Sequence, residues 1–189
     1  MKGPELTRSL LALAAFLATP ALAAPPMWTV QQGQSRIGFS GANAGNKFTG
    51  QFGQWAVQVR FDPADLLHSA ANVTIGTASA KTGDKFQESA LAEGEWFDPA
   101  HFPRATFVTR AITAAGPGRY VADGVLTIKG KALPAKLPFT LKIAGKTATM
   151  TGQTVIDRIA YGVGAKADGT GQWVTRQIGL SINLVAQRQ

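Results

Sequence analysis

The sequence predicts an all-β domain made of short antiparallel strands with one helical insertion. Apolar and polar residues alternate with a period of two at 55–61, 72–75 and 177–184, which is typical of strands with one buried face. Glycine and proline recur between such segments, as expected for tight turns. An open sheet of so many short strands would expose its edges, so the strands must close into a barrel or stack as a sandwich.

The chain starts with the pattern of a cleaved signal peptide at residues 1–23. Two positive residues, Lys2 and Arg8, precede a short apolar run at 10–18, and Ala21-Leu22-Ala23 forms a small-residue cleavage site. The apolar run is much shorter than the roughly 20 residues that a membrane-spanning helix needs. We expect a single β domain at 24–189. Because the sequence contains no cysteine, the bacterial periplasm is its expected location.

The strands after the signal peptide follow from the same alternation, segment by segment. Beyond the three segments named above, strands are expected at 36–40, 48–52, 106–112, 120–128, 135–143 and 147–156. Turns rich in glycine or proline separate several of them, at 41–45, 116–118 and 145–146. Altogether, about nine strands are expected.

Residues 81–102 depart from the strand pattern and predict a short helix at about 83–92. Thr82 or Asp84 is a suitable N-cap for this helix. Phe86, Ala90 and Leu91 lie near one face of this helix.

Charge is unevenly distributed along the chain, whose formal net charge is +8. Five carboxylates near the expected helix predict an acidic patch on a basic body: Asp84, Glu88, Glu93, Glu95 and Asp98. We interpret Asp84 and Glu88 as a solvated pair beside the helix N-terminus rather than as a catalytic pair. The lysines and arginines are scattered singly, which argues against nucleic acid as a partner and leaves weak contact with acidic lipid headgroups open.

The sequence offers little for catalysis. His68 and His101 lie far apart and lack the spacing of metal ligands. No nucleophile elbow, phosphate-binding glycine loop or dinucleotide fingerprint follows an expected strand. We therefore expect a protein without enzymatic activity, cofactor or metal site.

Large apolar residues on the expected strands and after the helix predict an apolar pocket, although each of them taken singly is more often a core residue. The candidate ligand-binding residues are Phe48, Phe52, Trp55, Trp96, Phe97, Phe107, Leu126, Phe139 and Ile156. The Trp96-Phe97 pair is the sharpest candidate, because it ends the helix where a lid would cover a barrel mouth. One ring is then expected to serve the core and the other the ligand.

Asp157-Arg158, followed by Tyr161, is the main polar candidate outside the helix. Neighbouring strand residues point to opposite faces, so one of Asp157 and Arg158 faces the interior. A buried Arg158 would need an anionic or carbonyl partner such as a ligand headgroup, whereas an exposed ion pair at the strand end is the favoured alternative. Arg158 and Tyr161 complete the candidate binding residues.

Several motifs follow one another over essentially the whole chain after the signal peptide. They are Trp28-Thr29-Val30, Phe48-x-Gly50-x-Phe52, Thr82-Gly83-Asp84, Glu95-Trp96-Phe97-Asp98, Phe102-Pro103-x-Ala105-x-Phe107 and Gly124-x-Leu126-Thr127-Ile128-Lys129-Gly130. In order and spacing, these motifs resemble the YceI family. The resemblance implies a single lipocalin-like antiparallel β-barrel. It also implies an interior tunnel that binds a polyisoprenoid or a related amphiphile such as an isoprenoid quinone.

We expect a periplasmic binding or carrier protein for a polyisoprenoid or isoprenoid-quinone-type lipid. Burial of the tail would supply the affinity, because each buried methylene contributes ~0.8 kcal/mol. Two alternatives remain open: an accessory protein or enzyme of membrane quinone or respiratory metabolism, and a stress-related interaction module whose acidic helix docks on a basic partner. A homodimer and a peripheral membrane contact also remain open.

Overall fold

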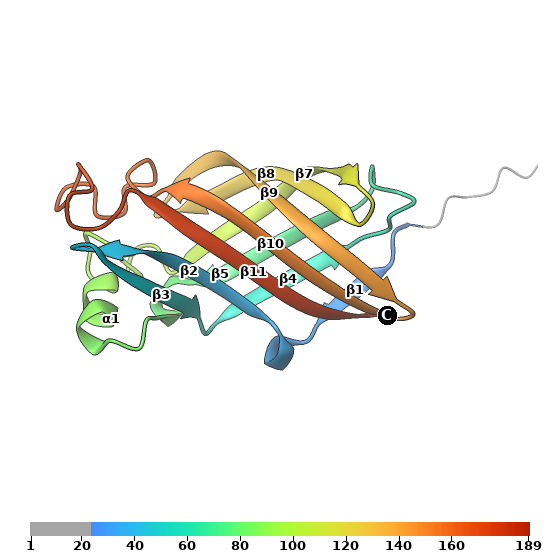
Figure 1. Ribbon diagram of the computed structural model, residues 1–189, viewed down its shortest axis with the longest axis horizontal. Coiled ribbons are helices and arrows are strands. Elements are labelled where there is room, and N and C mark those ends of the chain that lie inside the picture. The colour runs from blue at the N-terminus through green and yellow to red at the C-terminus, as the bar shows by residue number, and fades with distance from the viewer. Residues whose placement is uncertain (1–23) are drawn as a thin grey trace, which may run out of the picture.

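The computed structural model describes residues 24–189 and shows one closed antiparallel β-barrel. The expected signal peptide at 1–23 lies outside the described residues. Eleven strand segments form a single sheet, which closes because β1 (Met27–Val30) pairs with both β4 (Trp55–Arg60) and β11 (Gln177–Arg188). The lipocalin-like barrel is therefore confirmed over the sandwich, and its long tilted strands are seen in Figure 1.

The barrel wall consists of long strands, three of which are interrupted. In the first, a 3-10 turn at Gln32–Gln34 separates β1 from β2 (Arg36–Asn43). In the second, residues 53–54 separate β3 (Asn46–Phe52) from β4. In the third, a 3-10 turn at Thr77–Ser79 separates β5 (Ala70–Gly76) from β6 (Ala80–Lys81). The uninterrupted strands are β7 (Arg104–Gly116), β8 (Arg119–Ile128), β9 (Lys131–Ala144), β10 (Thr147–Asp157) and β11.

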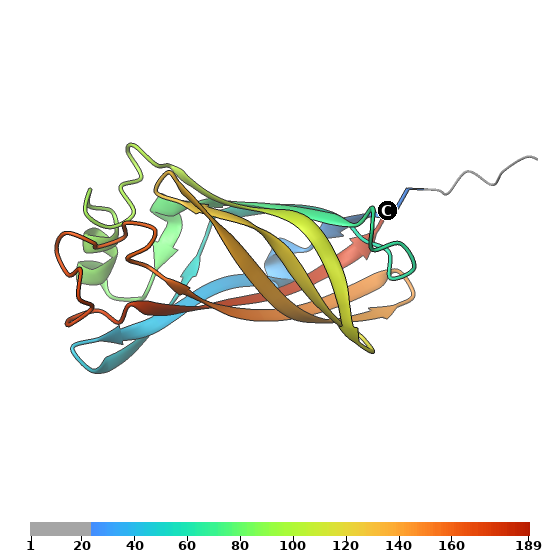
Figure 2. The same cartoon turned by 90° about the horizontal axis from the view of Figure 1, so that it is seen from above.

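The barrel end that carries residue 24 and the C-terminus, on the right in Figure 2, is filled by side chains, and we call it the closed end. Its buried core consists of Trp28, Phe61, Ile112, Ala122, Ala148 and Ala186. The Trp28 indole N–H donates to the Phe61 carbonyl at 2.9 Å, and the Phe61 and Tyr120 rings meet edge to face at 5.2 Å. These contacts bury the Trp28 and Phe61 rings inside this end of the barrel.

The opposite end, which we call the lid end, is covered by two long connections. They are the lid, residues 82–103, and the cap loop, residues 158–176 (Figures 1 and 2). The lid lies where the wall is incomplete, because within the described chain the outer side of β3 is paired only at Gln51 and Phe52. The Thr77 hydroxyl donates to the Phe102 carbonyl at 2.7 Å and ties the end of the lid to the wall.

The lid contains α1 (Lys85–Leu91), which confirms the expected helix with slightly narrower bounds. Asp84 is its N-cap: the carboxylate accepts hydrogen bonds from the N–H groups of Phe86 at 2.8 Å and Gln87 at 3.1 Å. No helix within residues 24–189 is long and apolar enough to cross a membrane.

Of the three apolar residues that lie near one face of α1, only Phe86 is exposed. This residue is 84% exposed, whereas Ala90 and Leu91 are half-buried. The Glu88 carboxylate accepts hydrogen bonds at 3.0 Å from two N–H groups of the preceding turn, and these contacts fix the rotation of the helix. A helix of about two turns with fixed rotation can bury only one side, so Phe86 is left in solvent.

Candidate ligand-binding site

Two adjoining cavities lie inside the barrel. The larger has a volume of about 180 Å³, and the smaller, of about 100 Å³, lies beneath the lid and the cap loop. Four residues line both cavities: Phe52, Ile75, Leu126 and Leu180. The two cavities therefore adjoin and share part of their wall, and we call them together the tunnel.

The larger cavity is lined almost entirely by hydrocarbon. Only three of its lining residues have polar side chains, namely Thr109, Lys136 and Thr154. The Lys136 ammonium pairs with Asp123 at 3.3 Å and is largely exposed, and the Thr109 hydroxyl is bonded to the backbone of Ala71. A ligand segment in this cavity meets almost no free hydrogen-bond partner, so it must itself be apolar.

Most of the candidate residues from the sequence lie on this tunnel. Phe107 and Phe139 line the larger cavity, Phe52 and Leu126 line both, and Phe48, Trp96, Phe97, Ile156 and Arg158 line the smaller one. The period of two explains the strand residues, because positions i and i+2 or i+4 share one face of a strand.

Trp55 and Tyr161 line neither cavity. Trp55 is half-buried beside the strand break at 53–54. Tyr161 is buried in a core cluster that includes Ala105 and Val163, and burial raises the pKa of its phenol. The structure therefore places Tyr161 in the wall behind the tunnel rather than at its surface.

Phe39, on β2, lines the smaller cavity but was not among the candidates. Its ring centroid lies 6.4 Å from that of Phe48 and 5.1 Å from that of Phe52. Gly50 makes room for it, because a Cβ at that position would fall 2.2 Å from the Phe39 ring. The Phe48-x-Gly50-x-Phe52 spacing was the available signal, since a glycine between two aromatics on one strand face leaves space for a ring from a neighbouring strand.

The two rings of the Trp96-Phe97 pair have different neighbours. The Phe97 ring meets the Phe52 ring edge to face at 5.9 Å, which joins the lid to the tunnel wall. The Arg158 guanidinium lies 5.4 Å from the centre of the Trp96 ring, in cation–π contact. A Cβ added to Gly164 would come within 3.1 Å of the same ring. Trp96 is therefore held by the cap loop, whereas Phe97 packs on a residue of the tunnel.

Arg158 is 2% exposed and uses all of its N–H groups within the protein. Nε donates to the Thr175 carbonyl at 3.1 Å, Nη1 to the carbonyls of Val163 and the next residue, and Nη2 to the Asp168 carboxylate at 2.7 Å and the Val174 carbonyl at 2.7 Å. A guanidinium has five donors. None is left for a ligand headgroup, so this geometry does not support headgroup binding by Arg158.

The favoured expectation that Arg158 belongs to an exposed ion pair at the strand end is wrong. The strand β10 ends at Asp157, and Arg158 enters the interior of the cap loop while Asp157 pairs instead with the exposed Arg176. The hydrogen bond from Arg176 outweighs partial burial and lowers the pKa of Asp157. Adjacent residues thus belong to separate ion pairs, one buried and one exposed.

Asp168 anchors the cap loop from inside. Besides Arg158, its carboxylate accepts hydrogen bonds from the consecutive backbone N–H groups of residues 172–174. Burial alone would raise the pKa of Asp168, but these hydrogen bonds and the charge of Arg158 outweigh burial and lower it. The cap loop is therefore organised around one buried, ionised pair.

Two charged residues join the lid to the cap loop. Lys129, in the turn after β8, donates from Nζ to the lid carbonyls of Gly94 at 2.6 Å and Glu95 at 2.9 Å and to the cap-loop carbonyl of Gly162 at 3.4 Å. The Glu95 carboxylate in turn accepts from the backbone N–H groups of Lys166 at 2.6 Å and Ala167 at 3.2 Å, and these bonds lower its pKa. The lid and the cap loop thus form one connected cover over the smaller cavity.

The acidic patch expected near the helix is largely engaged in internal contacts. Asp84 caps α1, Glu88 binds the preceding turn and a neighbouring lysine, Glu95 binds the cap loop, and Asp98 pairs with a histidine. Of the five carboxylates, only Glu93 has no hydrogen-bond partner in the part of the chain that the structure describes. These acids are therefore mainly structural.

Within residues 24–189, no group of three or more His, Cys, Asp or Glu side chains is placed to hold a metal ion. His68 and His101 each pair at 2.8 Å with an aspartate three positions earlier, and both are largely exposed. Neither histidine lies on the tunnel.

The profile of the YceI-like domain matches residues 28–186 of this chain, which covers the whole barrel. The chain belongs to the YceI family. This YceI-family chain is 35% identical to BcnA of Burkholderia cenocepacia, whose crystal structure superposes with a TM-score of 0.79 over 82% of this chain and 98% of that one.

Two further relatives are more distant. A polyisoprenoid-binding domain from Saccharophagus degradans, implicated in plant cell wall breakdown, is 13% identical with a TM-score of 0.63 over 86% of this chain and 98% of that one, which shows a shared fold. A UPF0312 protein of Vibrio parahaemolyticus is 26% identical over 125 residues, or 66% of each chain. The alignment thus spans somewhat less than two thirds of that relative's length.

Proposed function

We propose that this YceI-family protein is a periplasmic carrier or sequestering protein for an isoprenoid lipid, and that it works by burying an apolar tail without catalysis. The tunnel carries this proposal: it is lined by hydrocarbon, reaches the buried core of the closed end and is covered at the lid end. The shared fold of a polyisoprenoid-binding domain supports a prenyl chain as the ligand class. The periplasmic location rests on the signal-peptide pattern at 1–23.

The proposed binding depends on the tail rather than on the headgroup. Phe52, Leu126 and Leu180 lie at the junction of the two cavities, so an extended chain that passes them would contact both. Arg158, the polar candidate beneath the lid, has no free donor. The interaction-module alternative has less support, because the carboxylates near α1 are mostly held in internal hydrogen bonds.

The most direct test is mass spectrometry of the organic extract of protein purified from its native periplasm. The proposal expects one class of prenyl lipid in amounts close to those of the protein, and its headgroup would show whether the ligand is a quinone. Protein that is free of lipid in its native host, or that carries only straight-chain lipids, would contradict the proposal.

Affinity should rise with tail length until the tunnel is full. Each added isoprene unit should strengthen binding at least about tenfold, because several further carbons leave water. Isothermal titration of a series with one headgroup and increasing prenyl length would measure this, and burial of apolar surface should give a negative heat-capacity change. A headgroup without a tail is the control, and equal affinity for it would point to a polar site instead.

The exported protein should begin at Ala24 or within a residue or two of it, because Ala21-Leu22-Ala23 fits the small-residue specificity of signal peptidase. The intact mass of protein from a periplasmic extract measures this start directly. A full-length product retained in the membrane would overturn the periplasmic assignment.

A further inference from the structure

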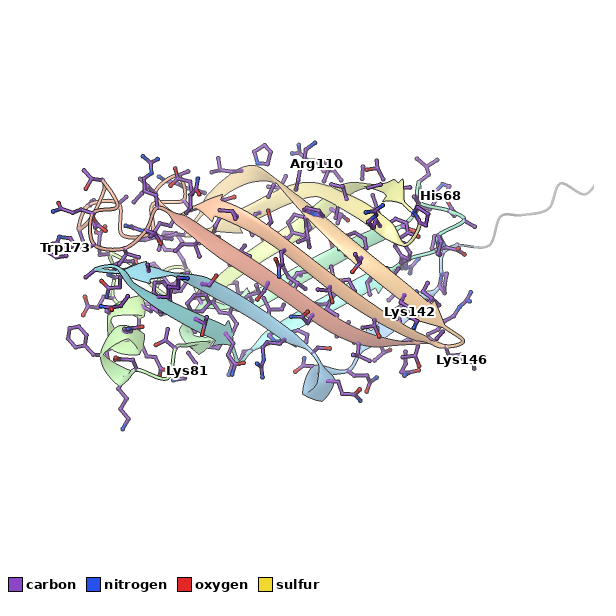
Figure 3. The ribbon with its side chains drawn as sticks, viewed as in Figure 1. His68, Lys81, Arg110, Lys142, Lys146 and Trp173 are labelled. Carbon is purple, nitrogen blue, oxygen red and sulfur yellow. The ribbon has the colours of Figure 1, made fainter. Side chains whose placement is uncertain are left out.

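Two aromatic side chains of the described residues lie mainly in solvent. Phe86 is 84% exposed and Trp173 is 61% exposed, whereas the other aromatic residues of 24–189 are buried or half-buried. Phe86 belongs to α1 in the lid, and Trp173 belongs to the cap loop and is labelled at the lid end in Figure 3. Both exposed rings are therefore carried by the two segments that cover the tunnel.

Internal hydrogen bonds fix the backbone beneath both rings. The Trp173 N–H donates to the buried Asp168 carboxylate at 3.2 Å, and the Trp173 carbonyl accepts from the Ala44 N–H at 2.7 Å. The Phe86 N–H donates to Asp84 at 2.8 Å. The exposed rings are thus displayed by ordered structure, and each of them leaves a large apolar surface in water.

The charges near these rings favour an anionic partner. Lys85 is next to Phe86, Lys166 lies in the cap loop, and Lys47 follows the β2–β3 turn that contacts Trp173. All three are exposed, and none of them forms an ion pair with a described residue. Most carboxylates of this end are instead held by hydrogen bonds within the lid and cap loop.

We propose that the lid end docks on an anionic phospholipid bilayer, with Phe86 and Trp173 in the headgroup region and Lys47, Lys85 and Lys166 facing acidic headgroups. Aromatic rings prefer the membrane interface, and lysines near a charged leaflet add electrostatic attraction. Docking in this orientation brings the covered end of the tunnel to the membrane. A lipid tail then moves beneath the lid with little exposure to water. This inference rests on the proposed function, because it concerns how a tail reaches the tunnel.

The closed end also carries an exposed apolar residue and positive charge, so it is the alternative surface for membrane contact, but its packed core makes it the less suitable one. Leu67 is 88% exposed there, and Arg60, Lys142, Lys146 and Arg188 supply positive charge; Figure 3 labels His68, Lys142 and Lys146 at this end. This end is filled by the core around Trp28. A lipid tail that entered from this side would have to pass between these packed core side chains, which also line the larger cavity. Leu67 also provides a matched control, because it is equally exposed but lies away from the lid.

Vesicle flotation tests the proposal with the processed wild-type protein and its F86S, W173S and L67S variants. With vesicles that contain phosphatidylglycerol and phosphatidylcholine, F86S and W173S should each weaken binding by about tenfold to a hundredfold, the usual effect of burying a large apolar side chain. L67S should bind like wild type. Binding should also fall with added salt and on vesicles of phosphatidylcholine alone.

A second measurement does not depend on how the variants fold. Brominated lipids should quench part of the tryptophan fluorescence of the wild-type protein, and this quenched part should disappear in W173F, which keeps an aromatic ring. Loss of binding by L67S but not by F86S or W173S would place the membrane at the closed end and overturn the proposal. Absence of vesicle binding, or quenching that is unchanged in W173F, would also overturn it.

Uptake of a long-chain isoprenoid from detergent separates this inference from the proposed function. F86S and W173S should take up the lipid from detergent like wild type and lose only uptake from vesicles. If they also fail in detergent, the two rings act on ligand binding itself and the docking proposal is wrong. If wild type binds vesicles through these rings but takes up no isoprenoid from detergent, the docking surface stands and the proposed function fails.

Discussion

Replacement of Arg158 by alanine should lower the free energy of unfolding by about 3 to 5 kcal/mol, because the Asp168 carboxylate would stay buried without its counter-ion. The two side chains are only 3% and 5% exposed and meet at 2.7 Å. Urea unfolding followed by circular dichroism would measure the loss. The matched control is Arg176→Ala, which removes an arginine from the neighbouring exposed pair with Asp157 and should change stability little. Equal effects of the two variants would contradict this account of the cap loop.

Replacement of both members of the buried pair should not restore stability. In many proteins, apolar residues replace a buried ion pair without loss. Here Arg158 and Asp168 also bind backbone carbonyls of residues 163–164 and 174–175 and backbone N–H groups of residues 172–174. Each backbone group left unpaired costs about 1–3 kcal/mol. Recovery of wild-type stability by a double variant, Arg158→Met with Asp168→Leu, would show that these backbone contacts matter less than the geometry indicates.

The contribution of Asp168 to stability should be lost in acid. Its pKa is lowered in the folded protein, so its stabilisation is complete above the ordinary pKa of an aspartate and disappears as the pH falls through the lowered folded value. Asp168→Asn does not titrate. The difference in unfolding free energy between wild type and this variant should therefore be large at neutral pH and shrink below about pH 4. A difference that stays constant into acid would contradict the assignment.

Truncation of the two lid aromatics should have different consequences. Trp96→Ala removes the ring that packs on Arg158 and Gly164, and it should destabilise the fold by about 3 to 5 kcal/mol. Phe97→Ala removes the ring that meets Phe52 and should weaken lipid binding by about tenfold to a hundredfold. This corresponds to about 1.5–3 kcal/mol of binding free energy, the usual contribution of burying a large apolar side chain. The loss of folding stability should be smaller. Thermal melting and the amount of retained lipid measure the two effects.

Phe97→Leu is the control for this pair, because it keeps an apolar side chain against the tunnel and should retain most of the lipid. The lid hypothesis fails if Trp96→Ala and Phe97→Ala both keep the wild-type lipid load. It also fails if Phe97→Ala loses stability but no lipid, since Phe97 would then be an ordinary core residue.

Local sequence was sufficient for the helix and for nine of the eleven strand segments, but it missed the short strands β1 and β6. The alternation at 177–184 lies within β11, and Asp84 caps α1 through contacts that span three residues. Such features depend on the alternation of side chains between the two faces of a strand, which we call parity, and on contacts between residues close in sequence. A sequence pattern therefore predicts them directly. The same parity also placed Phe48 and Phe52 on one face of β3, where the structure shows both at the smaller cavity.

Parity was not sufficient to define the site. It states that Trp55 and Val57 share a strand face, but only Val57 lines the tunnel, because Trp55 lies at the strand break beside it. It also gave no means to choose Phe39, whose ring occupies the space above Gly50 on a neighbouring strand. Selection of lining residues requires the register between strands, which depends on contacts across the sheet.

The sequence by itself determined an all-β chain with one capped helix and an apolar interior, because these follow from periodicity and local hydrogen bonds. Only the tertiary structure decided that the sheet closes through β1 and β11, that Arg158 is buried with Asp168, and that Phe86 faces solvent. Each of these outcomes depends on where distant segments meet: the two ends of the chain, the turns of the cap loop, and the lid against the barrel wall. A local sequence pattern does not show which distant segments come into contact. The free energy of these contacts is gained only after the intervening loops have closed.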